Sequence, residues 1–204
     1  MAFTFFFRDN TVLELIAKHV VPNLVGYSRI RIWDGGCAMG PEPYSLAITI
    51  AESMGPFAFR NIHIDATDID EQENFGKTIE MGVYPSDQVQ RIPQEILAKY
   101  FVPAEEQGYY RIIDTVRQSI HFRKHDLLSL KPIAEGFHLI MCKNVLLHFQ
   151  PKERSQVIKM FHSALATGGY FATEKTQEMP EELKHLFELI SPEVHLYKKV
   201  EAAV

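Results

Sequence analysis

The sequence predicts an α/β fold with a mostly parallel sheet and one small antiparallel insertion, in a chain of 204 residues. Short apolar runs typical of buried strands alternate with longer stretches typical of helices, which implies βαβ units. A glycine-rich turn follows the first expected strand and leads directly into a helix. A segment rich in proline, residues 83–123, interrupts this alternation. We therefore expect one domain over residues 1–204, with 83–123 as an inserted helix and β-hairpin subdomain.

The first half of the chain is expected to contain two strand–helix units. The first helix begins near Thr11, because Thr11 and Glu14 fit a capping box, and it ends before Pro22. A later helix has two prolines in its first turn and Gly55 as its stop signal. Helices are expected over 11–21, 41–54 and 71–81, and strands over 30–33 and 62–67.

The second half begins with the insertion, in which two β-rich pieces separated by Asp114 and Thr115 predict a hairpin. Regular alternation returns after residue 126, and apolar residues at helical spacing support a helix that begins near Lys152. Helices are expected over 96–101, 152–166 and 180–190, and strands over 109–113, 116–122, 137–142, 170–173 and 194–200.

The composition excludes several classes of protein. The net charge is −5 and basic residues form no run, so we expect no nucleic-acid partner. No stretch approaches the roughly 20 apolar residues of a membrane span, and no signal peptide is evident, so we expect no membrane insertion. Cys37 and Cys142 lie far apart in apolar contexts, which indicates free thiols and a cytoplasmic protein. No His or Cys set has metal-ligand spacing, and we predict no metal.

The segment from Arg29 to Ser45 is the most informative part of the chain. A strand, a glycine turn and a helix bring backbone N–H groups and a helix N-terminus to a ligand. Asp34 opens the turn, and a carboxylate there suits a ligand with positive charge, such as S-adenosylmethionine (SAM), which carries an ammonium and a sulfonium. The pattern D-x-G-C-x-x-G, which ends at Gly40, resembles the first motif of class I SAM-dependent methyltransferases. A plain tight turn is the alternative.

Polar residues at the ends of the expected strands are the next candidates, because ligands of open α/β sheets bind at the carboxyl ends. Asp68 and Asp70 follow the second strand, where an acidic residue can accept both ribose hydroxyls. Either could instead cap the next helix. Lys143 and Asn144 follow a later strand. Asp126 could accept a hydrogen bond from an adenine amino group, or be an ordinary loop aspartate.

Five motifs, taken in order, resemble those of the CheR family, the SAM-dependent glutamate O-methyltransferases of chemotaxis receptors. They are T-F-F-F-R-D at 4–9, G-P-E-P-Y-S at 40–45, A-T-D-I-D at 66–70, M-C-K-N-V-L-L-H-F at 141–149 and T-G-G-Y-F at 167–171. The resemblance implies a class I sandwich with a seven-stranded sheet. The insertion lies where the family has a small three-stranded subdomain. The family's N-terminal helical domain, which helps to dock the receptor, is absent from this sequence.

The resemblance also assigns roles to individual residues. SAM is the implied cofactor and S-adenosylhomocysteine the product, with Arg8 and His148 as the catalytic residues. The implied cofactor-binding residues are Thr4 and Arg8 beside SAM and the substrate carboxylate, Gly36 and Glu42 at the methionine part, Asp68 at the ribose, Asp126 and Leu127 near the adenine, and Lys143 and Asn144 at the remaining edge. A solvated residue near a chain end is the alternative for Arg8, but the three aromatic residues before it indicate an anchored segment.

Three positions depart from the family pattern. His148 stands in place of a tyrosine, and its charge changes near neutral pH. The alternative is a partly buried histidine packed beside Phe149. Lys143 replaces an arginine and so lacks a planar fork of donors. Pro41 replaces the first of two glutamates, and Glu42 keeps the second.

The predicted reaction is transfer of a methyl group from SAM to a carboxylate, a protein glutamate in the first instance. A glutamate, with an ordinary pKa of about 4.3, is already ionised at neutral pH and needs no general base. The site must align oxygen, methyl carbon and sulfur and exclude water, and Arg8 can hold a carboxylate by two hydrogen bonds. The alternatives are a small-molecule carboxylate as acceptor, a SAM-binding sensor or scaffold without transfer, and a nicotinamide-binding oxidoreductase. The oligomeric state stays open.

Overall fold

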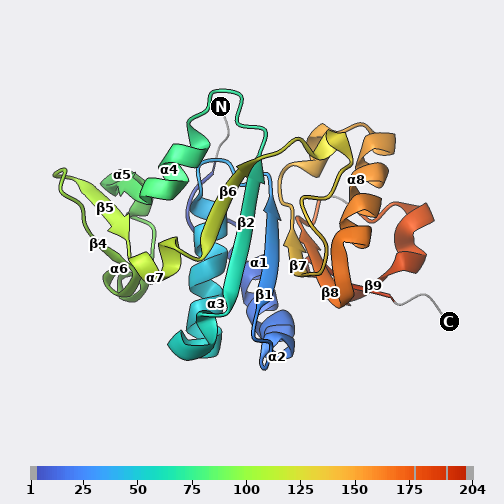
Figure 1. Ribbon diagram of the computed structural model, residues 1–204, viewed down its shortest axis with the longest axis horizontal. Helices are drawn as coiled ribbons and strands as arrows, with labels where there is room; N and C mark the ends of the chain where they lie inside the picture. The colour runs from blue at the N-terminus through green and yellow to red at the C-terminus, as the bar shows by residue number, and fades with distance from the viewer. Residues whose placement is uncertain (1–3, 177, 192, 201–204) are drawn as a thin grey trace.

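The computed structural model describes residues 4–176, 178–191 and 193–200. Its main sheet has seven strands in the order β6-β2-β1-β7-β8-β10-β9 (Figure 1). The strands are β1 (Ile30–Gly35), β2 (Ile62–Asp68), β6 (Ile120–Lys124), β7 (Phe137–Met141), β8 (Leu165–Thr173), β9 (Phe187–Ser191) and β10 (His195–Lys199). Strand β10 runs in the direction opposite to the other six strands of this sheet. The predicted mostly parallel seven-stranded sheet is confirmed.

Helices cover both faces of this sheet, because side chains of a strand alternate between faces. Ile30 and Ile32 of β1 belong to a core with α1–α4, whereas Trp33 faces a second core with α8. The helices are α1 (Asn10–Leu15), α2 (Val21–Leu24), α3 (Pro41–Phe59), α4 (Phe75–Met81) and α8 (Pro151–Ala164). No helix in the described part of the chain is long and apolar enough to cross a membrane.

The insertion forms a second, antiparallel sheet in the order β3-β5-β4, at the left of Figure 1. Its elements are β3 (Val83–Pro85), α5 (Ser86–Val89), α6 (Gln94–Tyr100), β4 (Phe101–Pro103) and β5 (Tyr109–Ile112), and the short helix α7 (Asp114–Arg117) follows it. The predicted hairpin between 109–113 and 116–122 is wrong. Residues 114–117 form a helical turn that buries Val116, and β6 pairs in parallel with β2 in the main sheet.

Other boundaries differ from the predictions for local reasons. The first helix continues beyond Pro22, because that proline lies in the first turn of α2, where its missing N–H is no loss. The capping box at Thr11 does not form, since the helix begins at Asn10. Gly55, with φ of +77°, breaks α3, but one more turn follows it. The predicted helix over 180–190 is a 3₁₀ helix, Glu181–Leu186, followed by β9.

Candidate functional site

Three adjacent parallel strands, β2, β1 and β7, end at the same edge of the main sheet, here called the carboxyl edge. The register pairs Asp34 with Ala66 on one side and with Met141 on the other. Residues that follow these strands are therefore neighbours although they are far apart in the sequence. This register brings the turn after Asp34, the loop after Asp68 and the Lys143–Asn144 pair together.

A buried group of two carboxylates and one ammonium lies at the centre of this edge. Asp34 is fully buried, and Glu42 reaches it from the first turn of α3 with a side chain 12% exposed. The Lys143 Nζ lies 3.5 Å from Glu42 Oε2, and its side chain is 1% exposed. Burial, and next the nearby Glu42 carboxylate, raise the pKa of Asp34 well above its ordinary value, whereas Lys143 opposes the shift.

In the described part of the chain, three carboxylate oxygens of this group have no hydrogen-bond donor. They are both Asp34 oxygens and Glu42 Oε1. The Asp34 and Glu42 carboxyls are close enough to share a hydrogen bond when one of them is protonated. Burial also raises the pKa of Glu42, and Lys143 is the largest influence in the opposite direction. Unsatisfied buried acceptors are costly, so they indicate a place for a ligand that brings donors or positive charge. SAM has an ammonium, which donates hydrogen bonds, and a sulfonium, which is positively charged, so it suits these acceptor oxygens.

The glycine turn after β1 is closed against its neighbours. Gly36 has φ of +91°, and a Cβ on it would lie 2.1 Å from Cγ2 of Val145. The N–H groups of Gly36 and Cys37 both donate to the Thr67 carbonyl, at 2.7 and 3.0 Å. Only glycine fits here, because the backbone is left-handed and the space is already filled. The turn is thus more than a tight connection, since it packs on the loop after β7.

The two aspartates after β2 have different roles. Asp70 accepts hydrogen bonds from the backbone N–H groups of Asn74, Phe75 and Gly76 at the start of α4. These bonds lower its pKa although burial alone would raise it. Asp68 is half-buried and accepts hydrogen bonds from Ala38 N at 2.9 Å and from Asp70 N at 3.3 Å. The capping alternative therefore describes Asp70, and Asp68 stays at the carboxyl edge beside the glycine turn.

Asp126 and Leu127 follow β6 at the same edge. The Asp126 Oδ1 accepts a hydrogen bond from Leu128 N at 2.8 Å, and its side chain is exposed. Leu127 is buried, and its Cδ2 lies 3.7 Å from where a Cβ on Gly35 would be. Asp126 thus caps the 3₁₀ helix Leu127–Ser129, as a loop aspartate does, and keeps an exposed carboxylate oxygen at the carboxyl edge.

The N-terminal segment is anchored beside this edge. Phe6 is buried, with its ring 5.0 Å from that of Tyr84 and 5.4 Å from that of Phe101, both of the insertion. Phe7 N donates to Ser45 Oγ at 2.8 Å. Thr4, four residues before Arg8, is half-buried. The predicted anchoring by aromatic residues is confirmed.

Arg8 itself joins the residues that follow β7. Its Nη2 donates to Asn144 Oδ1 at 3.3 Å, and its carbonyl accepts a hydrogen bond from Lys143 Nζ at 3.2 Å. Lys143 Nζ also lies 3.7 Å from Asp9 Oδ2. The tertiary structure therefore brings Arg8, Lys143, Asn144 and Glu42 into one group. The alternative of a solvated arginine does not hold, because Arg8 is half-buried.

Glu174, which directly follows β8, was not among the predicted site residues. Its side chain is buried; Oε2 accepts hydrogen bonds from Asn144 N and Thr173 Oγ1, both at 2.8 Å, and Oε1 has no partner. Asn144 has φ of +58°, so Glu174 holds a strained residue whose side chain in turn binds Arg8. The rule that selected Asp68, a polar residue after a buried strand, would have found it.

His148 lies apart from this group. It ends the 3₁₀ helix Leu146–His148, its N–H donates to the Val145 carbonyl at 2.9 Å, and its side chain is exposed. The alternative of a partly buried histidine packed beside Phe149 is therefore wrong. Its proposed contact with a methyl acceptor has no support from the geometry beyond its place on the loop after β7.

Comparisons with known proteins agree with this arrangement. The sequence model of the family described as CheR methyltransferase, SAM binding domain, matches residues 2–195, so the chain belongs to that family. A chemotaxis protein methyltransferase of Listeria innocua is 35% identical over 166 residues, which are 80% of this chain and 60% of the relative. A probable chemotaxis protein methyltransferase of Rhizobium etli is 28% identical over 201 residues, 96% of this chain and 74% of the relative.

The chain thus spans about 60% of the length of the Listeria relative. Among solved structures, the magnesium protoporphyrin IX methyltransferase of Synechocystis PCC 6803 with bound SAM is 18% identical, with a TM-score of 0.43 over 90% of this chain and 73% of that chain. Because the matched family is a SAM-binding domain, the predicted family and the predicted cofactor are both confirmed.

Proposed function

We propose that this chain, as a member of the CheR methyltransferase SAM-binding domain family, catalyses transfer of a methyl group from SAM to the side-chain carboxylate of a protein glutamate. One observation carries the proposal. The carboxyl edge combines buried carboxylate oxygens that have no donor among the described residues, which suit a cation, with Arg8, which suits an anion. A methyl transfer from a sulfonium to a carboxylate requires both kinds of binding side by side.

The proposed cofactor contacts are these. Asp34 and Glu42 face the positive charges, Gly36 allows close approach, Asp68 takes the ribose hydroxyls, and Leu127 offers an apolar surface to the adenine. The sulfonium of SAM supplies an electrophilic methyl group when it is bound. Thr4, Asp126, Lys143 and Asn144 complete the proposed set at the edge of the site.

Arg8 is proposed to orient the acceptor. Its guanidinium can hold a carboxylate by two parallel hydrogen bonds, and Asn144 fixes the direction of that guanidinium. The acceptor is already ionised at neutral pH, so its oxygen attacks without a general base. Most of the rate enhancement then comes from alignment and exclusion of water rather than from proton transfer. His148, on the exposed side, is proposed to donate a hydrogen bond to the acceptor.

Two features favour a protein substrate. The relatives are named chemotaxis protein methyltransferases, and Arg8 is reached from the surface rather than from an enclosed cavity, since its side chain is 30% exposed. We accordingly propose a receptor-like glutamate as acceptor and a cytoplasmic location. A SAM-binding sensor without transfer remains the second candidate, because Lys143 and His148 depart from the family pattern at the reacting end.

Incubation with methyl-labelled SAM and extracts of the host tests the proposal. We expect a labelled protein whose label is released as methanol by mild base, as a methyl ester requires. Calorimetry with SAM and with NAD is the accompanying measurement. SAM binding without any base-labile label would favour the sensor, and binding of NAD in place of SAM would contradict both candidates.

A further inference from the structure

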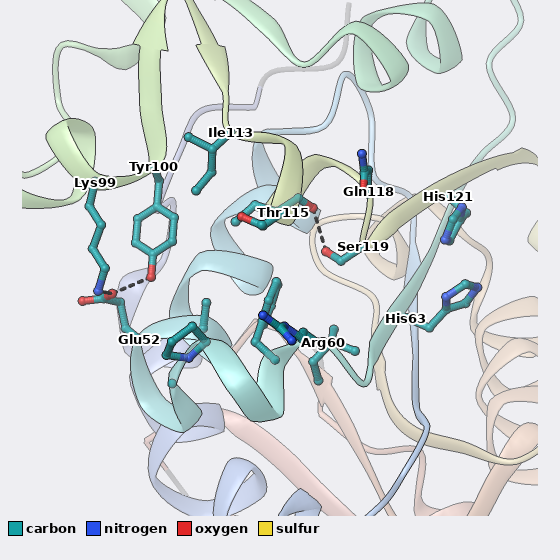
Figure 2. Close-up of a pocket in the computed structure, with 16 residues that line it drawn as sticks. Glu52, Arg60, His63, Lys99, Tyr100, Ile113, Thr115, Gln118, Ser119 and His121 are labelled. Carbon is teal, nitrogen blue, oxygen red and sulfur yellow. Dashed lines mark hydrogen bonds and ion pairs between the residues drawn. The ribbon is translucent and has the colours of Figure 1, made fainter.

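A pocket lies at the opposite edge of the sheet, here called the amino edge. Its volume is about 660 Å³, and it opens where β2 and β6 begin, beside the break in α3 at Gly55 and the base of the insertion (Figure 2). His63, at its rim, precedes Asp68 on β2 by five residues, which is about 16 Å along a strand. None of the residues assigned to the carboxyl edge lines this pocket.

One wall of the pocket is apolar. Ala51 and Phe59 from α3, Ile62 at the start of β2 and Val116 of α7 are buried, and Ile113 lies at the base of the insertion. Pockets of this volume hold small organic molecules, and most of their affinity comes from apolar walls. The wall therefore suits an aromatic or acyl body.

The pocket is lined by one carboxylate, that of Glu52, and by two basic side chains, those of Lys99 and Arg60. The Glu52 carboxylate is already satisfied, because Tyr100 Oη donates to it at 2.5 Å and Lys99 Nζ also donates to it. Arg60, at the end of α3, has no carboxylate within ion-pair distance in the described part of the chain. In the view of Figure 2 its guanidinium lies between the Glu52 group and the two histidines.

Two histidines form the other side of the pocket. The rings of His63 and His121 lie 4.1 Å apart, centroid to centroid. The carboxylate nearest to them in the sheet, Asp65, is buried and bound by Arg31 at 3.8 Å and by Arg123 at 2.9 Å. This side consequently offers a ligand the hydrogen-bond donors of two imidazole rings, and the carboxylate that lines the pocket, Glu52, lies on its other side.

We propose that the amino-edge pocket binds an organic anion with an apolar body, an aryl or acyl carboxylate, sulfonate or phosphate ester. The charged head group binds to Arg60 and the histidine pair, and the body packs on Phe59 and Ile113. The site is separate from that of the cofactor and does not depend on the proposed methyl transfer. A bound ligand would contact both the main sheet and the insertion.

Two fluorescent probes of nearly the same shape test the proposal. 1-Anilinonaphthalene-8-sulfonate carries a sulfonate, and N-phenyl-1-naphthylamine has the same apolar body without charge. We expect the sulfonate to bind the intact chain at one saturable site, about tenfold more tightly than the neutral probe. Arg60→Ala should remove that advantage, about 1.4 kcal/mol, and leave the affinity for the neutral probe unchanged. Arg60→Lys should keep most of the advantage.

The controls separate this site from others. Lys159→Ala removes an exposed positive charge from α8 and should change neither affinity. Thr115→Trp places a large side chain at the exposed pocket rim and should weaken both probes, with far-UV circular dichroism as the check on folding. Equal affinity for the two probes, no effect of Arg60→Ala, or displacement of the sulfonate by saturating S-adenosylhomocysteine would overturn the proposal.

Discussion

The two edges of the main sheet carry charged groups of opposite kinds, buried carboxylates at one and an exposed guanidinium at the other. At the carboxyl edge, Asp34 and Glu42 share one ammonium, that of Lys143, and three of their oxygens have no partner. At the amino edge, the single lining carboxylate, Glu52, has two donors, and the unpaired charge is that of Arg60. The first edge is built for a cation and the second for an anion. The direction of the strands predicts a ligand site at the carboxyl edge but does not predict one at the amino edge.

The largest expected effect is on turnover at the carboxyl edge. Arg8→Ala removes the group that holds the acceptor, and we expect turnover in the labelled-methyl assay to fall about a thousandfold, close to 4 kcal/mol. SAM affinity measured by calorimetry should stay within about tenfold. Arg8→Lys, which keeps the charge but not the fork, should be intermediate. Turnover that Arg8→Ala leaves unchanged would remove this residue from the mechanism.

A single substitution made at both edges tests the difference in packing. Gly36 and Gly55 both have positive φ, but only a Cβ on Gly36 meets another side chain, that of Val145. We expect Gly36→Ala to lower the free energy of unfolding by about 3 kcal/mol, and Gly55→Ala by about 1 kcal/mol, in urea titrations. Adding Val145→Ala to Gly36→Ala should recover part of the loss. Equal effects of the two alanines would show that the turn after β1 is not tightly packed.

Removal of one carboxylate tests which edge binds the cation. Glu42→Gln deletes a charged acceptor, and we expect SAM affinity by calorimetry to fall about thirtyfold, or roughly 2 kcal/mol. The affinity of the amino edge for the anionic probe should not change. Glu188→Gln, at an exposed position of β9, is the matched control and should leave both affinities as they are. An unchanged SAM affinity in Glu42→Gln would contradict the role of the buried acids.

The two edges should respond to pH with opposite signs. Burial and then Glu42 raise the pKa of Asp34, so this carboxylate loses its charge at a higher pH than usual, and SAM binding should weaken as pH falls. At the amino edge, burial and then His121 lower the pKa of His63, Asp65 raises it, and Arg29 and Arg31 lower it. Protonation there adds positive charge as pH falls, so anion binding should strengthen. Parallel trends in the two titrations would mean that one of the edges is misassigned.

The smallest effect is expected at His148. Its side chain is exposed, so His148→Tyr should keep or raise turnover, within about threefold of the starting value. The labelled-methyl assay measures this, with SAM affinity as the control. A complete loss of turnover would mean that the histidine has a role that tyrosine cannot fill.

Several elements show how far the sequence could be interpreted. The strand Ile30–Gly35 and the helix after it were predicted within two residues at their beginnings, because apolar runs and glycine signals are local. The predicted hairpin between 109–113 and 116–122 was wrong. The β-branched side chains of Thr115 and Val116 favour a strand locally, but packing of Val116 in the core favours a helical turn. Glu174 was missed although it directly follows the predicted strand 170–173, because the rule that selected Asp68 was not applied to that strand.

The sequence by itself determined the α/β class, the first strand with its glycine turn and helix, the family and hence the cofactor, because periodicity, turn residues and motifs are written along the chain. Only the tertiary structure decided that β6 joins the main sheet and that Glu174 holds Asn144 and through it Arg8. These facts depend on distances between residues 30 to 140 positions apart. Such distances follow from which faces pack together, and no local pattern encodes them.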